Sequence, residues 1–581
     1  MCVVMITGSC TDTAAPKPRA VKTTIALPAT VVPPAITVGL IPKFVDVSAT
    51  SGITRRESSV RTCTETATDL RIRFSGASFD RGDRLNGAAC QIVDFAAGVA
   101  IGDFNNDGLS DIYATFVGGP GQLFVNDGGG KFHDGTADAG LDALDDSSVG
   151  AAFVDIDRDG DQDLFVTTLF AKRYWMFVND GRGHFVDEAR ARGIDAESDK
   201  VHVGFSIAIG DYDRDGYSDV FVSEYPGLFA AADPDDLERS RLFRNLGRND
   251  PGRFEDVTSR VGISDGSPLF PTYAFGATFR DLDNDGWLDL AVTGDFGTSR
   301  MFFNDRGRRF VDESAASGMG TEENGMGSTT ADIDFDGDPD RFVSSIRDGR
   351  GAAQAKDGNW GTSGNRLFTN LGERRFTDRT DAANVRDGGW GWGAAFVDFT
   401  NTSSHALVQV SGMQVPISSA SEIFALGPTK LWVTDRAGQM VDVASKAGLL
   451  VRNGRGLATA DFDGDGRIDV LIGHPGLAPT LYRNVSQNVG HFVRVRIQGT
   501  SGQSEGIGAR VRVEFGDRVA TVEVQSVTDF LGQSERVAHI GVGDHTTAQR
   551  VTVTFPATGR KVELRDVAVD QVIEIDESMS R

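Results

Sequence analysis

Long apolar runs, basic residues and helical periodicity are all scarce in this sequence. No apolar run approaches the ~18 residues of a transmembrane helix, so none is expected. Lysine and arginine number 58 against 83 aspartates and glutamates, and the net charge of −25 argues against nucleic acid and anionic membrane surfaces as partners. The 70 glycines, with few apolar residues at helical spacing, indicate many strands and turns.

Catalytic motifs are also missing. The sequence contains no Gly-x-Ser-x-Gly elbow, no zinc-binding histidine pair and no glycine loop of the phosphate-binding type. The eight histidines are scattered along the chain. No catalytic residue is therefore assigned, and enzyme activity is left open with the balance against it.

Cysteine is rare, with four in 581 residues. Cys63 and Cys90 flank a polar, glycine-rich stretch and either form a disulfide or remain as two free thiols. A bond closing these 28 residues would contribute about 3.5 kcal/mol in the loop-entropy account. The other two, Cys2 and Cys10, lie in the N-terminal leader.

The residues that are present in excess are aspartates, and they form loops. Residues 155–163 place carboxylates at positions 1, 3, 5 and 9 and a glycine at position 6. Oxygen ligands at alternate positions, a carbonyl at position 7 and a glycine for the turn suit Ca²⁺. An EF-hand would need a glutamate at position 12, where this sequence has Val166 inside an apolar β-type run. The ion is therefore expected at a turn between two strands.

The loop recurs at residues 103–111, 211–219, 281–289, 332–340 and 461–469, with a decayed copy at 398–406. Their first positions lie 52, 56, 70, 51, 66 and 63 residues apart, about one propeller blade each. The six intact loops hold 25 of the 83 carboxylates and predict about six Ca²⁺ ions. The predicted ligands are Asp103, Asn105, Asp107, Leu109, Asp111, Asp155, Asp157, Asp159, Asp161, Asp163, Asp211, Asp213, Asp215, Tyr217, Asp219, Asp281, Asp283, Asp285, Trp287, Asp289, Asp332, Asp334, Asp336, Asp338, Asp340, Asp461, Asp463, Asp465, Arg467 and Asp469.

Each loop follows a strand of small residues and precedes an apolar strand, then Leu-Phe-x-Asn and Phe-x-Asp segments. Four strands per repeat predict an all-β, seven-bladed propeller. The last repeat lacks its fourth strand, and residues 44–47 supply a Phe-x-Asp copy ahead of the first repeat. This N-terminal strand is expected to close the ring and remove two open sheet edges.

These motifs resemble the FG-GAP (VCBS) repeats of integrin-like propellers. After Asn484 the pattern changes to Gly506–Val511, Leu531–Ser534 and His539–Gly543, which resemble the ASPIC/UnbV domain of chains of the cartilage acidic protein type. Phe555-Pro556 stands where that family usually has Trp-Pro. The resemblance covers about residues 40–577 and implies an integrin-like propeller followed by a small β-domain.

Three segments are expected: residues 1–35 as a leader, disordered or derived from a signal; 36–484 as the propeller; and 485–581 as the C-terminal β-domain. The Gly8-Ser9-Cys10 order resembles the end of a lipoprotein signal, whereas Thr7 and a short apolar stretch do not fit one. Since calcium loops of this sort need millimolar calcium, export is favoured: an extracellular, periplasmic or surface-anchored protein, with Cys10 as a candidate lipid anchor. A monomer is expected.

A ligand site is expected opposite the metal loops, where the long insertions gather at residues 50–97, 225–241, 345–366 and 412–430. The residues that enter the first strands would line the mouth of the axis there. The alternative is that they only fill the axis. They are His202, Phe275, Met326, Trp390, Trp392 and Arg455.

Three functions fit this sequence. The first is an exported calcium-binding module for adhesion to an unidentified protein or carbohydrate. The second, suggested by UnbV-type relatives, is a natural-product tailoring enzyme of the cyclase or lyase type with its site in the propeller mouth. The third is a structural surface protein with no discrete ligand.

Overall fold

The computed structural model describes residues 40–55, 93–144, 147–169, 171–195, 200–225, 238–263, 273–348, 361–413, 427–435, 439–499, 505–525 and 530–580. The predicted leader, the cysteine pair Cys63 and Cys90, and most of the four long insertions lie outside these residues. Strands dominate the described chain, and none of its helices is long and apolar enough to cross a membrane.

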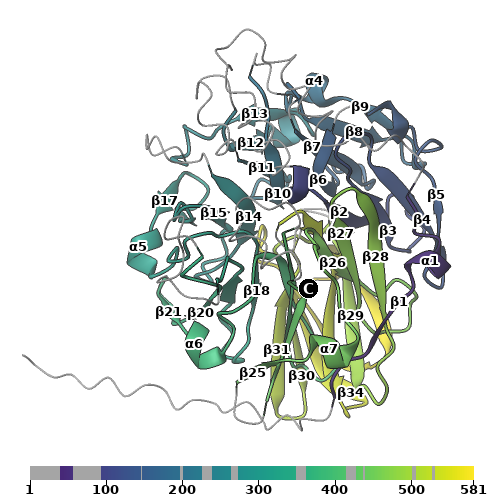
Figure 1. Ribbon diagram of the computed structural model, residues 1–581, viewed down its shortest axis with the longest axis vertical. Coiled ribbons are helices and arrows are strands. Elements are labelled where there is room, and N and C mark those ends of the chain that lie inside the picture. The colour runs from purple at the N-terminus through teal and green to yellow at the C-terminus, as the bar shows by residue number, and fades with distance from the viewer. Residues whose placement is uncertain are drawn as a thin grey trace, which may run out of the picture.

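Seven sheets of the described chain share one layout, in which four strands are hydrogen-bonded in antiparallel order. Figure 1 shows them arranged around a common centre. In chain order the sheets contain β2 (Val99–Gly102), β3 (Asp111–Ala114), β4 (Gln122–Gly128) and β5 (Lys131–Asp134); β6 (Ser147–Val154), β7 (Asp163–Leu169), β8 (Trp175–Asn179) and β9 (Phe185–Asp187); β10 (Gly204–Gly210), β11 (Asp219–Glu224), β12 (Arg241–Asn245) and β13 (Phe254–Asp256); β14 (Ala274–Arg280), β15 (Asp289–Gly294), β16 (Arg300–Asn304) and β17 (Phe310–Asp312); β18 (Ser328–Ala331), β19 (Asp340–Val343), β20 (Arg366–Asn370) and β21 (Phe376–Asp378); β22 (Gly391–Val397), β23 (Ala406–Ser411), β24 (Lys430–Thr434) and β25 (Met440–Asp442); and β26 (Leu457–Ala460), β27 (Asp469–His474), β28 (Leu477–Asn484) and β1 (Phe44–Asp46).

Short helices of one turn follow several fourth strands, where a buried small residue anchors each turn. The α-helical turns are α1 (Ser48–Ser51), α4 (Ala189–Arg192), α5 (Ser314–Ser317), α6 (Thr380–Ala383) and α7 (Ala444–Ala447), and the 3₁₀ turns are η1 (Leu141–Ala143), η4 (Gly247–Asn249) and η7 (Glu577–Met579).

The N-terminal strand β1 is the fourth strand of the seventh sheet. Phe44 pairs with Asn484 and Asp46 with Tyr482 in antiparallel register, as the missing strand in the sequence suggested. The Phe44 ring is buried and packs edge-on against Phe399 of the sixth repeat, with 5.0 Å between centroids. The two ends of the repeat array are therefore joined through β1.

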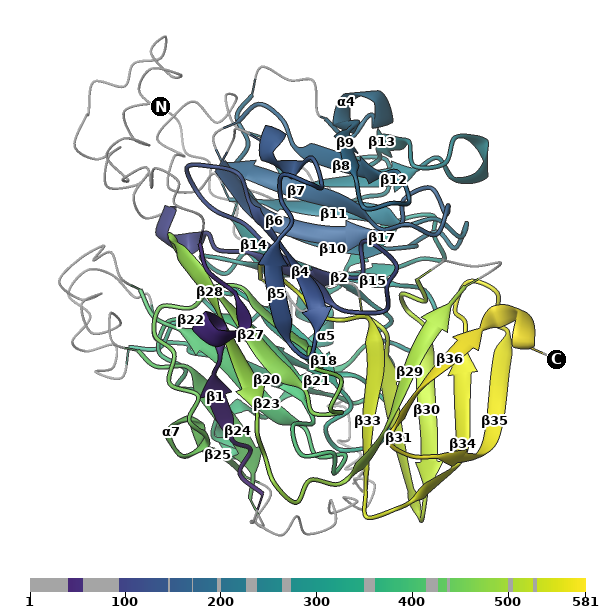
Figure 2. The ribbon, with the colours of Figure 1, turned by 90° about the vertical axis from the view of Figure 1, so that its right-hand side faces the viewer.

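The C-terminal residues form two further sheets that pack on each other. Figure 2 shows these yellow strands as a separate layer against one side of the propeller. Alternate valines from both sheets fill a core of their own, as the period-two pattern of the sequence requires. One sheet contains β33 (Val537–Gly543), β29 (His491–Gln498) and β36 (Gln571–Asp576), and the other β31 (Arg518–Glu523), β30 (Arg510–Phe515), β34 (Thr547–Thr554) and β35 (Lys561–Ala568).

One C-terminal segment enters the propeller itself. The short strand β32 (Gly532–Gln533) pairs in parallel with β2 of the first sheet, and the Val99 amide donates to the Leu531 carbonyl at 2.9 Å. The preceding Phe530 is fully buried in the axial core, 5.1 Å from the Trp392 ring. The all-β expectation of a propeller with a smaller C-terminal β-domain is confirmed, but the insertion of this segment was not foreseen.

Removal of β1 should open the seventh sheet. Deletion of residues 1–48 leaves β28 with an unpaired edge. It also removes the Phe44 side chain, whose burial stabilises the fold by about 2 kcal/mol. We expect a lower melting temperature and self-association, measured by calorimetry and by light scattering after size-exclusion chromatography. Deletion of residues 1–35, which leaves every described strand in place, is the control and should change neither. A monomeric 1–48 deletion with an unchanged melting temperature would contradict closure by β1.

Candidate metal centres

All six intact aspartate loops fold in one way. The carboxylate at position 1 accepts the backbone amide of the glycine at position 6 through Oδ2, at 2.9 to 3.3 Å. These glycines have φ between 81° and 96°, a left-handed conformation that glycine adopts without a steric penalty. Position 4 is also left-handed, for example Arg158 at 66° and Asn284 at 59°. The sequence rule of a glycine at position 6 thus has a direct conformational cause.

The loops bring their carboxylates together. In five of the six, three carboxylates offer oxygen atoms that all lie within 4.8 Å of one another. The first loop has Asn105 in place of the second aspartate, so it presents fewer carboxylates. The five groups are Asp155, Asp157 and Asp163; Asp211, Asp213 and Asp219; Asp281, Asp283 and Asp285; Asp332, Asp334 and Asp336; and Asp461, Asp463 and Asp465.

Several of these oxygens are buried and accept no hydrogen bond from any described residue. They include Oδ1 of Asp157, Asp281, Asp332 and Asp334. In Asp281 and Asp332, Oδ2 is occupied by the glycine amide, so the orphaned Oδ1 is the oxygen left for another partner. A buried acceptor without a donor costs about 1–3 kcal/mol, and a cation would satisfy it. The residues therefore fit a hard divalent ion such as Ca²⁺.

Burial and mutual repulsion raise the pKa values of these carboxyls. Desolvation, followed by the charges of Asp215 and Asp213, raises the pKa of Asp211 to about 8. Desolvation and the neighbouring aspartates Asp336 and Asp334 raise the pKa of Asp332 to about 7. With pKa values of about 8 and 7, the carboxyls of Asp211 and Asp332 titrate close to neutral pH, and a bound divalent cation would favour their charged forms.

Arginines contact the loops from outside the clusters. Arg192 donates to Oδ2 of Asp157 at 3.2 Å and Arg374 to Oδ2 of Asp283 at 2.6 Å. Because Arg192 uses Oδ2, Oδ1 of Asp157 stays available to the loop centre. These arginines offset part of the loop charge.

The residue at position 7, which is expected to supply a carbonyl ligand, is fixed by a hydrogen bond from its backbone amide. In every intact loop the position 7 amide donates to Oδ1 of the position 5 aspartate, at 2.8 to 3.1 Å. This contact fixes the peptide next to the cluster. The residues concerned are Leu109, Asp161, Tyr217, Trp287, Asp338 and Arg467.

The asparagine of the Leu-Phe-x-Asn motif joins each loop to its neighbour. Its backbone amide donates to Oδ1 of the position 9 aspartate at 2.7 to 2.9 Å. Its side-chain Nδ2 donates to the position 2 carbonyl of the preceding sheet's loop at 2.7 to 3.1 Å. The six bridging asparagines are Asn126, Asn179, Asn245, Asn304, Asn370 and Asn484.

The sixth sheet is the exception, since Thr434 stands where the asparagine would be and Ala406 where position 9 would be. Its loop still keeps the metal-loop backbone: Ser403, at position 6, has φ 61° and donates its amide to Oδ2 of Asp398 at 2.6 Å. The amides of Thr400 and Thr402 donate to Oδ1 of Asp398. Backbone donors thus satisfy the one carboxylate that remains.

The C-terminal β33 lies directly on this sixth loop. The Gly543 amide donates to the Asn401 carbonyl at 2.9 Å, and His539 Nε2 lies 2.8 Å from Asn401 Oδ1. A Cβ at Gly541 would lie 2.1 Å from Oδ2 of Asp398, so only glycine allows this approach. In the sixth sheet, therefore, the loop that lacks most of the metal ligands is contacted by the C-terminal domain.

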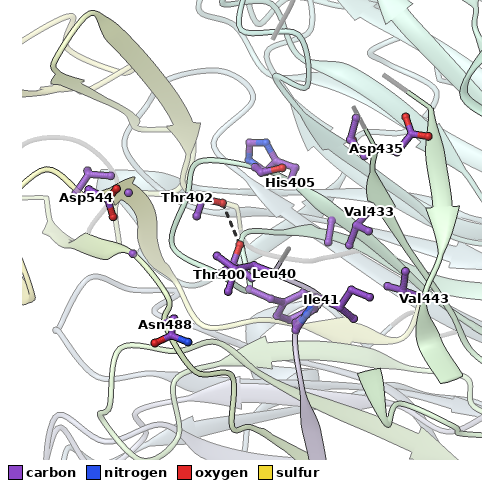
Figure 3. A pocket seen from close by; sticks show the side chains of 18 of the residues that line it. Leu40, Ile41, Thr400, Thr402, His405, Val433, Asp435, Val443, Asn488 and Asp544 are labelled. Atoms are coloured by element: carbon purple, nitrogen blue, oxygen red, sulfur yellow. Dashed lines mark hydrogen bonds between the residues drawn. The ribbon is translucent and has the colours of Figure 1, made fainter. Parts of the chain in front are cut away.

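Two open cavities border the loops. One of about 540 Å³ lies beside the sixth loop, and Figure 3 shows Thr400, Thr402 and His405 on one side with Val433 and Val443 on the other. The second, of about 810 Å³, lies between the first two loops and the C-terminal domain. Both cavities are formed by segments far apart in the chain, so no local pattern in the sequence indicates them.

The six residues assigned to the axial mouth are buried, none of them more than 3% exposed. Four of them belong to one hydrophobic cluster, namely Phe275, Met326, Trp390 and Trp392. His202 contacts Tyr174 and Glu224 instead. Phe275 lies 6.0 Å from Trp392, and Phe530 packs against both rings. Arg455 lies over Trp392 and pairs with Asp94 at 2.9 Å. The burial of these six side chains agrees with the alternative that they fill the axis.

The comparisons with known proteins identify both parts of the chain. A family model described as FG-GAP-like repeat matches residues 103–166, 155–222 and 281–343, and one described as ASPIC and UnbV matches residues 499–581. The chain therefore contains FG-GAP-like repeats and a C-terminal ASPIC and UnbV domain, which confirms the resemblance drawn from the motifs.

Three curated relatives are all cartilage acidic protein 1. The Homo sapiens protein is 23% identical over 522 residues, which cover 82% of this chain and 71% of that protein. The Xenopus tropicalis protein is 31% identical over 28% of this chain and 23% of that protein, and the Mus musculus protein 28% identical over 34% and 28%. In the last two comparisons the chain spans less than a third of its relative.

Among solved structures, the chain is similar to that of an Agrocybe aegerita lectin, a structure described as the basis of specific recognition of non-reducing terminal N-acetylglucosamine. It is 16% identical, covers 67% of this chain and 94% of the lectin chain, and has a TM-score of 0.36. We draw no conclusion about a ligand from this likeness.

Loss of one asparagine bridge should destabilise the protein. Asn245→Thr, which copies the residue of the sixth sheet, removes donors to the Ile156 and Ser218 carbonyls and leaves buried acceptors unpaired. We expect a loss of about 2–3 kcal/mol in the free energy of unfolding. Chemical denaturation measures it, with Thr434→Ala as the matched control at less than about 1 kcal/mol. Equal effects of the two substitutions would show that the bridge carries no special weight.

Proposed function

We propose that this chain is an exported, calcium-stabilised binding module built on a seven-bladed propeller. The observation that carries the proposal is the set of buried, orphaned carboxylate oxygens at the centres of the aspartate loops. Position 1, 3, 5 and 9 side chains and the position 7 carbonyl would hold each ion, with Asn105 at position 3 of the first loop. Bound calcium would neutralise the clusters and fix the turns between the first and second strands.

Export follows from the affinity such loops usually have. Calcium sites of extracellular modules have dissociation constants of about 10⁻⁴–10⁻³ M, which require millimolar calcium outside the cell. The net charge of −25 fits this assignment, because bound cations would cancel part of it. The start of the chain, including Cys10, lies outside the described residues and adds nothing to this argument.

A binding role is favoured over the two alternatives. A tailoring enzyme with its site in the propeller mouth would need space there, but the described side chains fill the axis around Trp392 and Phe530. A structural protein without a ligand would not need the open cavity of about 540 Å³ at the sixth loop. Hydroxyl and carboxylate groups beside apolar walls there suit a polar organic ligand such as a sugar unit.

Calcium removal should lower stability. A site with a dissociation constant of about 10⁻⁴ M in 1 mM calcium gains roughly 1.4 kcal/mol, so six sites contribute several kcal/mol. We expect EGTA to lower the melting temperature, and added calcium, but not added magnesium at the same concentration, to restore it fully. Calorimetry checks this, and an unchanged midpoint after chelation would refute the calcium proposal.

The calcium stoichiometry should be six per chain. The sixth loop has one carboxylate, and backbone amides already occupy both of its oxygens. Elemental analysis after dialysis in millimolar calcium should give six ions, and five for Asp211→Asn. Asp398→Asn is the matched control and should leave the ratio at six. A ratio of seven that falls to six in Asp398→Asn would show that the sixth loop binds an ion.

The cavity beside the sixth loop should bind the ligand. A glycan array probed with the calcium-loaded chain should give signals that Thr402→Trp abolishes, because the indole fills the cavity next to Thr400. Thr434→Trp, at its border, should weaken binding less. Array signals that persist in Thr402→Trp would place the ligand elsewhere, and an array without signals would favour the structural alternative over a carbohydrate-binding role.

A further inference from the structure

The C-terminal domain rests on the same face of the propeller as the metal loops. Arg496 Nη2 donates to the Gly108 carbonyl of the first loop at 3.2 Å. Arg510 Nη2 donates to the Gly337 carbonyl of the fifth loop at 2.8 Å, and its Nη1 contacts Asn284 in the fourth. A single domain therefore contacts loops that belong to different sheets.

Three glutamates of this domain contact loops at the same point. Glu505 Oε2 accepts the backbone amide of Asp155 at 3.1 Å, and Glu535 Oε2 accepts that of Asp461 at 3.4 Å. Glu523 lies at the same position of a third loop, beside the backbone of Asp281. In each case the backbone contacted is that of the first residue of an intact loop, whose side chain is a predicted ligand.

Each glutamate is held by an arginine in a buried ion pair. Arg280 Nε lies 3.4 Å from Glu523 Oε2, with both side chains at most 7% exposed. Arg536 pairs with Glu505, and Arg494 pairs with Glu535. Arg494 also donates to Oδ2 of Asp461 at 2.9 Å, so this pair contacts the loop carboxylate as well as the loop amide.

Glu505 is also linked to the loop at residues 103–111, through Gln162 of the loop at residues 155–163. The Gln162 side-chain amide donates to Glu505 Oε1 at 2.9 Å, and Gln162 Oε1 accepts the Asp103 amide at the same distance. The first residue of the first loop is thus fixed by the second loop, which is fixed by the C-terminal domain. Incidental surface contacts would fall at different positions of the loops. Here a glutamate of the C-terminal domain contacts the first residue of the loop in all three cases.

We infer that the C-terminal domain forms part of the metal centres at Asp155, Asp281 and Asp461, where Glu505, Glu523 and Glu535 act as positioning residues for the bound cation. The inference rests on the calcium binding proposed above. Hydrogen bonds from outside the ligand shell orient the ligands, and here each glutamate, itself fixed by an arginine, holds the first residue of its loop in place. Because coupling is reciprocal, calcium in these loops also strengthens the docking of the domain.

The test is a calcium-binding curve of the full-length chain. Equilibrium dialysis in calcium buffers should show six ions bound to the wild type at millimolar calcium. In Glu505→Ala/Glu523→Ala/Glu535→Ala, the ions at Asp155, Asp281 and Asp461 should need at least about tenfold more calcium. The ion at Asp103 should weaken less, because it depends on Glu505 only through Gln162, and the two ions at Asp211 and Asp332 should bind as before. Glu563→Ala, in the same domain but paired only with Arg550 and Arg565 in the described contacts, is the matched control and should bind like the wild type.

A second variant separates positioning from folding. Glu505→Gln/Glu523→Gln/Glu535→Gln keeps the hydrogen-bond acceptors, so it should fold and give affinities between those of the alanine variant and the wild type. Hydrogen exchange gives an independent readout: calcium should slow exchange of the Asp155 and Asp461 amides and of residues 530–535 in the wild type. The glutamine variant should lose part of this calcium-dependent protection.

The outcomes distinguish the two proposals. If the wild type binds no calcium, the proposed function fails and this inference fails with it. If the wild type binds six ions and both triple variants match its curve and its exchange pattern, calcium binding stands and the inference is overturned. A split curve in the alanine variant, partly restored by glutamine, supports it.

Discussion

The asparagine bridge is the contact on which the ring depends. Each bridging asparagine contacts two loops. Its backbone amide donates to the aspartate that ends the loop of its own sheet, and its side-chain Nδ2 donates to the second residue of the loop in the preceding sheet. Order in one metal loop is therefore transmitted to the next sheet, and a cation that rigidifies one loop also supports its neighbour. The sixth sheet shows the dependence in reverse. Position 9 is Ala406 and the bridging residue is Thr434, so the carboxylate acceptor of one hydrogen bond and the side-chain Nδ2 donor of the other are both missing.

The C-terminal domain compensates for what the ring lacks. It contributes Phe530 to the axial core, and its strand β33 lies on the sixth loop, where Asp398 is the one metal-type carboxylate that remains. Its arginines and glutamates meet a face crowded with aspartates, and the alternating charges make this contact favourable in a way that two acidic surfaces would not be. The propeller and the β-domain are best regarded as one structural unit, because each fills a deficiency of the other.

Local patterns in the sequence predicted the parts of this molecule that are local in cause. A glycine at position 6 and aspartates at alternate positions determine the loop, and β1 was assigned because a Phe-x-Asp segment was missing after Asn484 and present before the first repeat. The sequence left open whether Trp390 and Trp392 line an open mouth or fill the axis, because the answer depends on Phe530, about 140 positions away, entering the axis. The contacts of Glu505, Glu523 and Glu535 with the loops likewise depend on how two domains dock, which no spacing in the sequence encodes.

Closure of the ring also has a consequence for folding during synthesis, because β1 must wait for its partner strand β28. The amide of Lys43 donates to Ser486 Oγ, a residue 443 positions later. At about 5–20 residues per second, roughly 20–90 s of synthesis separate the two partners. During that interval β1 has no partner strand and exposes its backbone hydrogen-bonding groups to any other extended segment. A nascent chain of this kind has reason to be kept unfolded, or shielded, until its last repeat has been made.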